Sequence, residues 1–425
     1  MKLKVLVVAH GHPDFSKGGA EIAAHTLFQE LNRRYDCEAW LLAANGIAGL
    51  QHTGTPFSAR PREREMLFAG GTDYFLFSAN NLSHLTQDFA ELLRHIQPDV
   101  VHFHHYAVVG IEMLRVVRNT LPNAVIVLTL HEFLAICNRN GQMLKSNGSL
   151  CRNAEADPAE CHACMPGRSP QDYFLRRQYI RSFFALVDQF VAPSQFLKER
   201  YVTWGLPSDR ISVIENGQPS QPMPHSSGTR ASTAPAHRFA FFGQITPYKG
   251  LEVLLQAFSQ LPKSDQKLAR LDIFGGGQEM FDKEFQSRIE QGLASAHRNV
   301  QYRGRYAPED FGRLVATVDW VIVPSIWWEN SPLVIQEARL HGKPVICSDI
   351  GGMAEKVCHE RDGLHFQVGS AAALADTVQR CLREPDLWAR LQSGIEPPPT
   401  IARTADQLMA SYAHDHNRAK PSVTQ

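Results

Sequence analysis

Short apolar runs alternate with helical stretches along most of this chain, and they fall into two series. In the first series, runs rich in Val, Leu and Ala predict buried strands at residues 4–9, 37–43, 99–104, 124–129, 188–192 and 211–215. In the second series, similar runs predict strands at residues 239–243, 271–274, 300–302, 318–323 and 344–348. Strands that alternate with helices form a mostly parallel sheet covered by those helices. The pattern therefore predicts an α/β fold with two Rossmann-like doubly wound domains.

Residues 218–236 separate the two series. They are rich in Pro, Ser, Thr and Ala and have no apolar period, which is typical of a linker. We therefore expect an N-terminal domain at residues 1–217 and a C-terminal domain at residues 237–400. Residues 401–412 are predicted to form a last helix, and the tail after Ala413 is predicted to be disordered.

The composition is that of an ordinary globular protein. The 425 residues are 44% hydrophobic and 20% charged, which is enough for two domains. The formal net charge of +0 at pH 7 provides no general attraction to nucleic acid, so no nucleic-acid partner is expected. No apolar run approaches the ~20 residues that span a bilayer, and the first strand is too short for a signal peptide. We expect a cytoplasmic location.

A helix start is expected directly after the predicted strand 318–323. Asn330 or Ser331 is the predicted N-cap, and Pro332 is the predicted first helical residue. Gly342 is expected just after the end of this helix.

This helix start is suited to binding an anion. The N–H groups near Ser331, Leu333 and Val334 lack helical partners and lie at the positive end of the helix dipole, where a phosphate or diphosphate binds well. Glu337 lies about one turn further in, so its carboxylate can accept hydrogen bonds from two hydroxyls, as a ribose offers. Glu329, before the helix, can contact a group attached to the diphosphate. The alternative is two solvated carboxylates near a helix start.

The spacing of Glu329 and Glu337, with seven residues between them, resembles the signature of the retaining, nucleotide-sugar-dependent glycosyltransferases of family 4. The resemblance spans roughly residues 3–412. It implies a GT-B fold, in which two Rossmann-like domains face each other, with the acceptor on the N-terminal side and the nucleotide sugar on the C-terminal side. It also implies that Glu337 holds the ribose, that Glu329 holds hydroxyls of the donor sugar, and that helix 401–412 crosses back to the first domain.

Three glycine-containing loops of the second domain extend this resemblance. The loop 243–250 is similar to a family loop whose Arg and Lys grip the donor diphosphate, which assigns that role to Lys249. The Arg position holds Gln244, which donates hydrogen bonds but carries no charge. Gly276 lies in a turn that resembles the loop beside the nucleotide, and Gly351 begins a turn that resembles one after the signature helix.

Two loops of the first domain follow predicted strands and are candidates for the same site. Gly18 and Gly19 let the backbone approach a ligand closely, although their loop lacks the GxGxxG fingerprint of nicotinamide or flavin enzymes. His131 follows strand 124–129, where the resemblance places a histidine against the donor sugar near the reacting centre. The alternative for His131 is a strand-end histidine that is hydrogen-bonded to the backbone.

A polar insertion at residues 137–164 interrupts the alternation and contains four of the eight cysteines. Cys161 and Cys164 have the two-residue spacing that lets two thiolates bind one tetrahedral ion, and Cys137 and Cys151 would complete a structural zinc site. His162 could replace one of the cysteines as a ligand, and an iron–sulfur cluster is an alternative to zinc at this site. The alternative is four reduced cysteines without a metal.

The resemblance implies a hexosyltransferase that moves a sugar from a nucleoside-diphosphate sugar to a glycan or lipid-linked hydroxyl acceptor, with retention, in polysaccharide or glycolipid assembly. Catalysis is expected from Lys249, the helix amides and the Gly18–Gly19 loop, which stabilise the leaving diphosphate. No Asp-x-Asp pair occurs, so no catalytic metal is expected. The alternatives are a sugar-nucleotide epimerase or an inactive nucleotide-binding scaffold.

Residues 173–190 are rich in aromatic residues and arginines. Such a helix either rests on a membrane surface, at the inner face where a lipid-linked acceptor is met, or packs in the core with a basic edge.

Overall fold

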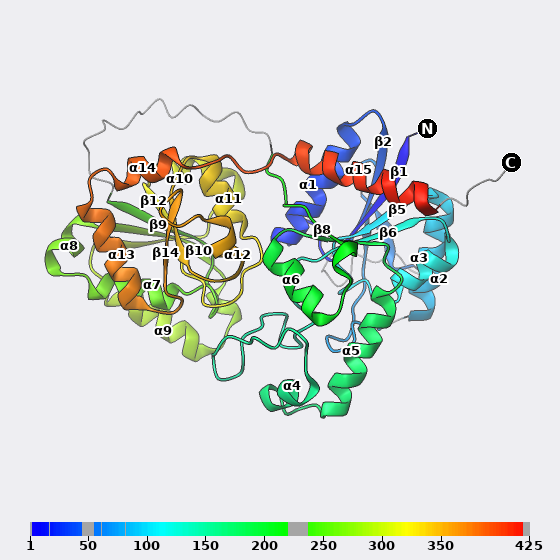
Figure 1. Cartoon of the computed structure of the whole chain (residues 1–425), viewed down its shortest axis with the longest axis horizontal. Coiled ribbons are helices and arrows are strands. Elements are labelled where there is room, and N and C mark those ends of the chain that lie inside the picture. The colour runs from blue at the N-terminus through cyan, green and yellow to red at the C-terminus, as the bar shows by residue number, and fades with distance from the viewer. Residues whose placement is uncertain are drawn as a thin grey trace. The chain divides into compact units, whose positions relative to one another are not determined.

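The computed structural model describes residues 2–16, 18–44, 55–60, 62–80, 82–219 and 237–419, without the side chains of residues 416–419. The chain divides into two compact units (Figure 1). Unit 1 comprises Met1–Ser220 and Pro399–Gln425, and unit 2 comprises Gln221–Pro398. The predicted linker lies outside the described residues except for Gln218 and Pro219.

In the described part of unit 1, eight strands form one sheet in the order β3-β4-β2-β1-β5-β6-β7-β8, and all neighbours are parallel except β3 and β4. The strands are β1 (Leu3–Ala9), β2 (Cys37–Ala44), β3 (Phe57–Ala59), β4 (Glu65–Phe68), β5 (Val100–Phe103), β6 (Val125–Thr129), β7 (Gln189–Ala192) and β8 (Ile211–Val213). The helices are α1 (Gly19–Arg33), α2 (Leu82–Ile96), α3 (Met113–Thr120), α4 (Pro158–Cys164), α5 (Pro170–Phe184), α6 (Gln195–Trp204) and α15 (Ile401–Ala419).

The last helix, α15, belongs to unit 1. Figure 1 shows it in red beside α1, and the apolar side chains of Ile401, Ala405 and Leu408 join the core formed by β1 and α1. Tyr412 is fully buried, and its hydroxyl lies 2.6 Å from Nδ1 of His102 on β5. The prediction of disorder after Ala413 is wrong for this helix, which continues to Ala419.

The chain leaves and re-enters unit 1 at one place. The N–H of Gln218 donates to the carbonyl of Pro399 at 2.9 Å, and the N–H of Ile401 donates to the carbonyl of Gln218 at 2.8 Å. A Cβ at Gly217 would lie 2.5 Å from Cα of Ile401, so only glycine permits this close approach. Both connections to unit 2 therefore run through a two-segment stem.

In the described part of unit 2, six parallel strands form a sheet in the order β11-β10-β9-β12-β13-β14. The strands are β9 (Arg238–Gln244), β10 (Arg270–Gly276), β11 (Val300–Gly304), β12 (Trp320–Val323), β13 (Val345–Ser348) and β14 (Gly363–Phe366). The helices are α7 (Leu251–Gln260), α8 (Lys263–Leu268), α9 (Lys283–Ala294), α10 (Phe311–Val315), α11 (Leu333–Leu340), α12 (Gly351–Lys356), α13 (Ala371–Arg383) and α14 (Leu387–Ser393). The strand order reverses between β9 and β12, where ligands bind in doubly wound sheets.

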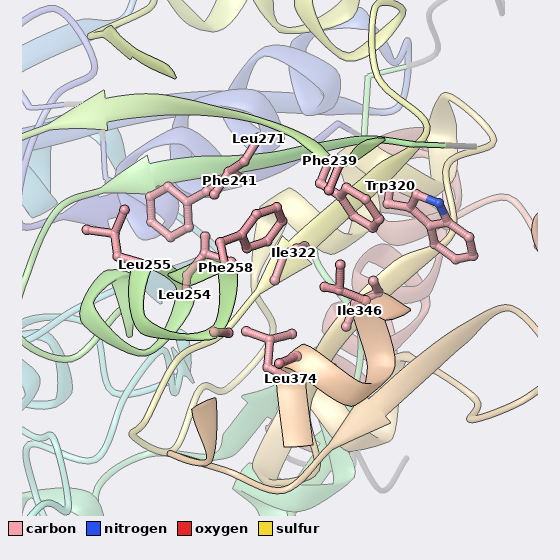
Figure 2. Packing of buried hydrophobic residues seen from close by; sticks show 14 of the residues in the cluster. Phe239, Phe241, Leu254, Leu255, Phe258, Leu271, Trp320, Ile322, Ile346 and Leu374 are labelled. Atoms are coloured by element: carbon pink, nitrogen blue, oxygen red, sulfur yellow. The ribbon is translucent and has the colours of Figure 1, made fainter. Parts of the chain in front are cut away.

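Alternate side chains of the unit 2 strands enter two different cores. Figure 2 shows one core, in which Phe239 and Trp320 stack with ring centroids 6.3 Å apart, and helices α7 and α13 contribute Phe258 and Leu374. The other face of the sheet packs Phe242 and its neighbours against α10 and α11. Helices thus cover both faces, which explains why the strands read as continuous apolar runs.

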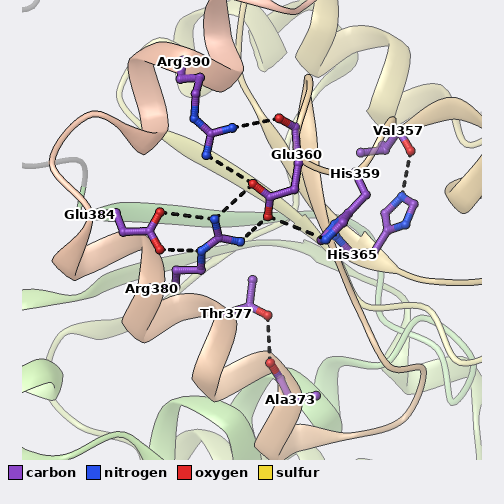
Figure 3. Close-up of polar contacts among 9 residues, drawn as sticks. All are labelled: Val357, His359, Glu360, His365, Ala373, Thr377, Arg380, Glu384 and Arg390. Atoms are coloured by element: carbon purple, nitrogen blue, oxygen red, sulfur yellow. Dashed lines mark hydrogen bonds and ion pairs between the residues drawn. The ribbon is translucent and has the colours of Figure 1, made fainter.

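A surface ion network holds α13 and α14 to the turn before β14 (Figure 3). The Glu360 carboxylate accepts hydrogen bonds from Arg380 at 3.0 Å and from Arg390 at 3.2 Å, and Arg380 also pairs with Glu384 at 2.6 Å. The hydrogen bond from Arg380 is the main cause that lowers the pKa of Glu360 to about 2. Among the described residues, no helix is both long enough and apolar enough to cross a bilayer.

Candidate functional site

The turn between β12 and α11 contains a buried carboxylate with three donors on one oxygen. Oε1 of Glu329 accepts hydrogen bonds from Nζ of Lys249 at 2.6 Å, Oγ of Ser325 at 2.7 Å and Nε1 of Trp327 at 3.0 Å. Glu329 is only 6% exposed. Its second oxygen, Oε2, has no hydrogen-bond partner among the described residues. The orientation of the carboxylate is therefore set through Oε1, while Oε2 is available to a ligand.

The loop between β9 and α7 places Lys249 beside this carboxylate. Gly250 follows Lys249 with a φ of 72°, and a Cβ there would lie 1.8 Å from the carbonyl oxygen of Pro324 at the end of β12. Only glycine satisfies both conditions. This close approach brings Lys249 and Glu329 together although they are far apart in sequence.

Glu337 on α11 is half-buried and has no hydrogen-bond partner among the described residues. Burial raises the pKa of its carboxyl to about 7. It faces Tyr306, whose pKa is raised by burial and then by the charge of Glu337. A carboxylate that is desolvated but unpaired gains from hydroxyl donors supplied by a ligand.

The predicted start of α11 is wrong by one residue. The helix begins at Leu333, Pro332 occupies the N-cap position, and no side chain caps it, so neither Asn330 nor Ser331 has the predicted role. The reason is tertiary: the N–H of Gly352 binds the carbonyl of Glu329 at 2.7 Å, and a Cβ at Gly352 would lie 1.6 Å from the carbonyl oxygen of Asn330. α12 thus holds this loop in place.

The first turn of α11 still presents free groups. The N–H groups of Leu333 and Val334 lie in the first helical turn, where no helical carbonyl reaches them. The hydroxyl of Ser331 is buried without a hydrogen-bond partner among the described residues. A buried donor without a partner costs free energy. A bound oxyanion would remove this cost by accepting the hydrogen bond.

Two neighbouring strand ends carry the predicted Gln244 and Gly276. These residues are direct partners in the β9–β10 register, and Gln244 is exposed. Arg305, directly after β11, packs its side chain against Gly276, where a Cβ would lie 2.5 Å from Cγ of Arg305, and it forms an ion pair with Glu279. Arg305 is not among the site residues predicted from the sequence, although a cation directly after a strand end is a usable signal.

In unit 1, four histidines gather where β1, β5 and β6 end. His10 follows β1, His104 and His105 follow β5, and His131 follows β6, and these three strands are neighbours in the sheet. Nδ1 of His104 lies 3.1 Å from Nε2 of His131, and the rings of His10 and His105 lie 4.5 Å apart. The sheet order therefore brings His131 into a cluster that sequence spacing does not show.

Burial and mutual repulsion keep members of this cluster uncharged. Burial is the main cause that lowers the pKa of His10 to about 2 and the pKa values of His104 and His131 well below the usual range, and neighbouring histidines add to it. Nδ1 of His10 and Nε2 of His104 are buried without a partner among the described residues. His131 thus offers a neutral imidazole at pH 7, which suits hydroxyl recognition.

Gly18 ends the β1–α1 loop, and Gly19, the other glycine predicted to let the backbone approach a ligand, is the first residue of α1. Gly18 is the N-cap of α1, but the space beside it is filled by the chain itself: a Cβ at Gly18 would lie 2.3 Å from Oε2 of Glu21. Glu21 is buried and accepts a hydrogen bond from Ser16 at 2.7 Å. Gly18 therefore makes room for a carboxylate of the protein.

Two groups of candidate metal ligands occur in the described part of unit 1. The four cysteines of the insertion line one small cavity of about 30 Å³, and they form no disulfide in the described residues. The members are Cys137, Cys151, Cys161 and Cys164. The second group is His12, His25 and Glu65. Their candidate ligand atoms all lie within 4.8 Å of one another.

The helix rich in aromatic residues and arginines is α5. Many of its aromatic side chains, and one of its arginines, point into the protein core. Tyr173, Arg176, Ile180, Phe183 and Phe184 are buried, whereas Phe174 and Leu175 are exposed. This is the pattern of a core helix with a small exposed apolar edge.

Solved structures of known proteins have the same two-unit architecture. The Anabaena protein HepE in complex with UDP and glucose is 20% identical, with a TM-score of 0.65 over 97% of this chain and 99% of that chain. A sucrose-phosphate synthase from Thermosynechococcus elongatus is 16% identical, with a TM-score of 0.68 over 97% of this chain and 98% of that chain. The fold is a two-domain, Rossmann-like GT-B fold.

Family models cover most of both halves of the chain. Residues 17–219 match the model described as Glycosyltransferase Family 4, and residues 233–395 match the model described as Glycosyl transferases group 1. The chain belongs to the GT-B glycosyltransferases of family 4 type.

Curated relatives match about half of this chain and about half of their own length. A D-inositol 3-phosphate glycosyltransferase from Corynebacterium efficiens is 28% identical over 220 residues, which are 48% of this chain and 51% of the relative. A lipopolysaccharide 1,2-N-acetylglucosaminetransferase from Salmonella typhimurium is 27% identical over 206 residues, which are 47% of this chain and 54% of the relative.

Proposed function

We propose that this protein is a retaining glycosyltransferase that transfers a sugar from a nucleoside-diphosphate sugar to a hydroxyl of a glycan or lipid-linked acceptor. The observation that carries the proposal is the pair of carboxylates at the start of α11. Glu329 keeps Oε2 unpaired beside Lys249, and Glu337 is desolvated and unpaired. The family membership and the relatives' activities support the same reaction class.

In this reaction the bond between the anomeric carbon and the diphosphate oxygen breaks, and a bond to the acceptor oxygen forms on the same face. The acceptor proton passes to an oxygen of the leaving diphosphate. The main difficulty is the charge that develops on the leaving group, so preorganised donors give most of the acceleration. Lys249 and the first-turn amides of α11 are among the donors that unit 2 offers.

The contacts of Glu329 explain how Lys249 serves the diphosphate without disorganising the site. The ammonium group of Lys249 has three N–H donors and uses one on Oε1 of Glu329. Ser325 and Trp327 hold the same oxygen, so Glu329 stays oriented when Lys249 also contacts a phosphate. Oε2 then accepts a hydroxyl of the donor sugar. Glu337 accepts the ribose hydroxyls, and Gly276 lies beside the nucleotide.

Gln244 carries no charge, but a guanidinium group from another residue lies at these strand ends. Arg305 packs against Gly276, the direct partner of Gln244. We propose that Arg305 supplies the second positive charge near the diphosphate, while Gln244 contributes hydrogen bonds only. In unit 1, neutral His131 contacts hydroxyls of the transferred sugar.

The proposed setting is assembly of cell-surface polysaccharide or glycolipid in the cytoplasm, at the inner face of the membrane. The exposed Phe174 and Leu175 on α5 support peripheral contact with a lipid surface. A sedimentation assay with anionic vesicles tests this: wild type is expected to bind, and Phe174→Ser/Leu175→Ser is expected not to. Equal binding of both proteins would contradict the assigned contact.

A donor screen tests the proposed reaction. Release of nucleoside diphosphate is measured for a panel of UDP-, GDP- and ADP-sugars with wild type, with Glu337→Ala and with Glu290→Ala. Glu290 is an exposed carboxylate on α9 and is the matched control. One donor is expected to be consumed by wild type and by the control but not by Glu337→Ala. Nuclear magnetic resonance of the product then reports the anomeric configuration.

The same screen separates the alternative functions. A sugar-nucleotide epimerase would convert one donor into an isomer without releasing nucleoside diphosphate. An inactive scaffold would bind a nucleotide without turnover even when cell-extracted, lipid-linked acceptors are added. A protein that bound no nucleotide at all would contradict the proposed donor site.

A further inference from the structure

Two clusters of potential metal ligands in unit 1 differ in how well their polar atoms are already satisfied. In the first cluster, the N–H of Asp14 donates to Nδ1 of His12 at 3.1 Å, which places the ring proton on Nε2. This Nε2–H points to Oε2 of Glu65 at 3.3 Å, and Nε2 of His25 lies 3.4 Å from Oε1 of the same carboxylate. The hydrogen bonds within this cluster satisfy both oxygens of Glu65 and both ring nitrogens of His12, so the cluster requires no metal ion.

The second cluster is the cysteine cavity, which gathers segments distant in sequence. Cys137 lies in the loop after β6, and Cys151 follows a hairpin-like turn in which its N–H donates to the carbonyl of Met143 at 2.8 Å. Cys161 and Cys164 lie on the short helix α4. All four sulfur-bearing side chains line the same cavity. No residue of α4 is fully buried, although the helix contacts α5, so apolar packing contributes little to its position.

A buried cation beside this cavity lacks a carboxylate partner. Arg176 is 3% exposed, and its guanidinium donates to the backbone carbonyls of Phe75 at 2.7 Å and Ala135 at 2.8 Å, and also to that of Leu134. Among the described residues it forms no ion pair with Asp or Glu. Burying an unpaired charge costs free energy, so a negative group near Arg176 would stabilise the folded protein.

Glu160 is the carboxylate in the lining of the cavity, and among the described residues it forms no ion pair with Arg176. The groups whose charges would act most strongly on Arg176 are two phenols, Tyr106 and Tyr201, and two thiols, Cys137 and Cys161. Phenols and ordinary thiols are uncharged at pH 7. Thiols become thiolates at neutral pH when they bind a metal ion. Metal binding would convert Cys137 and Cys161 into thiolates and so supply a counter-charge to Arg176.

We propose that Cys137, Cys151, Cys161 and Cys164 together bind one structural zinc ion. Each thiol releases its proton to solvent as its sulfur–zinc bond forms, so four thiolates and Zn²⁺ carry a net charge of −2. Arg176 neutralises part of this charge from the protein interior. Four thiolates in tetrahedral geometry are typical of structural zinc sites with no open coordination position.

The position of the site indicates what the zinc stabilises. Cys137 lies shortly after His131, and Arg176 binds the carbonyls of Leu134 and Ala135 between them. The zinc and Arg176 thus fix the loop that leaves β6, which also determines where His131 is held. The ion has a structural role and takes no part in sugar transfer, so this inference does not depend on the proposed function.

Metal analysis of the full-length protein, purified without chelators, tests the proposal. Wild type is expected to contain about one zinc ion per chain. Cys161→Ser/Cys164→Ser is expected to lose it, whereas Cys358→Ser, which changes a half-buried cysteine of unit 2, is expected to retain it. Wild type without zinc that also fails to take up added Zn²⁺ would overturn the proposal, as would iron with sulfide in its place.

Arg176→Gln tests the counter-charge separately from the ligands. Competition with a coloured zinc chelator is expected to show an affinity about 10- to 100-fold weaker than wild type, the usual effect of removing a partner around a metal site. Unchanged affinity would refute the role of Arg176. If the cysteine variant fails to fold, titration of wild-type thiols with an organomercurial decides instead: zinc is expected to be released in step with thiol modification. Release without thiol modification would contradict cysteine ligation.

Discussion

The strand ends of the two units differ in charge: those of unit 2 bring together charged side chains, and those of unit 1 bring together histidines that are mostly neutral. In unit 2, charged groups gather around the start of α11, with Lys249 on Glu329 and the unpaired Glu337 nearby. In unit 1, the strand ends gather imidazoles, of which His10, His104 and His131 are held neutral by burial. Charged groups suit a diphosphate and its ribose, whereas neutral donors and acceptors suit sugar hydroxyls. One architecture thus supports two recognition chemistries.

Removing the cation of unit 2 is expected to have the largest effect. Lys249→Met takes away the positive charge that stabilises the leaving diphosphate and leaves Glu329 buried without its ion partner. Turnover of the donor found in the screen is expected to fall about 100- to 1,000-fold. Lys263→Met, at an exposed position on α8, is the control. If Lys249→Met retained wild-type turnover, the charge assigned to unit 2 would have no catalytic role.

Glu337 is expected to give nucleotide binding a pH dependence. The ionised carboxylate accepts the ribose hydroxyls, and its pKa is raised to about 7, so affinity is expected to increase as the pH rises through this value. Glu337→Gln is expected to weaken binding about 10-fold or more, because a hydrogen bond to a charged group is lost. Calorimetry of nucleoside-diphosphate binding across this pH range measures both effects, and the variant accounts for titration of the nucleotide itself. The same pH slope in both proteins would exclude Glu337 as its source.

In unit 1, His131 is expected to remain neutral where exposed histidines titrate, at about pH 6.5. The cause is burial, followed by repulsion from His104 and His105. His104→Phe keeps a ring beside His131 but removes one repelling neighbour, so the pKa of His131 is expected to rise. Nuclear magnetic resonance titration of ring protons measures this shift. A His131 that already titrates near its usual pKa in wild type would remove the contrast between the units.

The smallest effect is expected from a charge outside the strand ends. Above the usual pKa of 4.5, Glu360 stabilises the fold, and this stabilisation is lost as the pH falls toward its folded pKa of about 2. Glu360→Gln is expected to lower the free energy of unfolding at neutral pH by about 1 kcal/mol at most, because solvent screens this network. Denaturant unfolding is expected to show the variant and wild type converging near pH 2, with turnover unchanged at neutral pH. A large loss of turnover would mean that the charges that matter are not confined to the strand ends.

The sequence predicts the fold well where strands are buried on both faces. Runs such as Val321–Val323 are apolar throughout, because helices cover both sides of the sheet. The strands missed by the sequence analysis, β3, β4 and β14, are short and include polar residues such as Ser58, Glu65 and His365. Their pairing, rather than a local pattern, makes them strands.

The candidate site is predictable where its residues lie close together in sequence. Glu329 and Glu337 are recognisable from their spacing around one helix start. The partnership of Lys249 with Glu329 depends on the approach of Gly250 to Pro324, which no local pattern reveals. The N-cap prediction at Asn330 and Ser331 is wrong for the same reason, since the competing contact comes from α12. His104 meets His131 only because β5 and β6 are neighbours.

The two-segment stem at Gln218 and Ile401 means that unit 1 is completed only by the last helix to be synthesised. The first strands of unit 1 leave the ribosome early, but their core requires α15, which is synthesised last. Unit 2 is continuous in sequence and has all of its strands before α15 emerges. Nε2 of His102 lies 2.7 Å from Oγ1 of Thr129, which is synthesised early, but Tyr412, the partner of its Nδ1, is synthesised only after the whole of unit 2. A chain that ended before α15 would therefore lack part of the core of unit 1, although all the described strands of both units would be present.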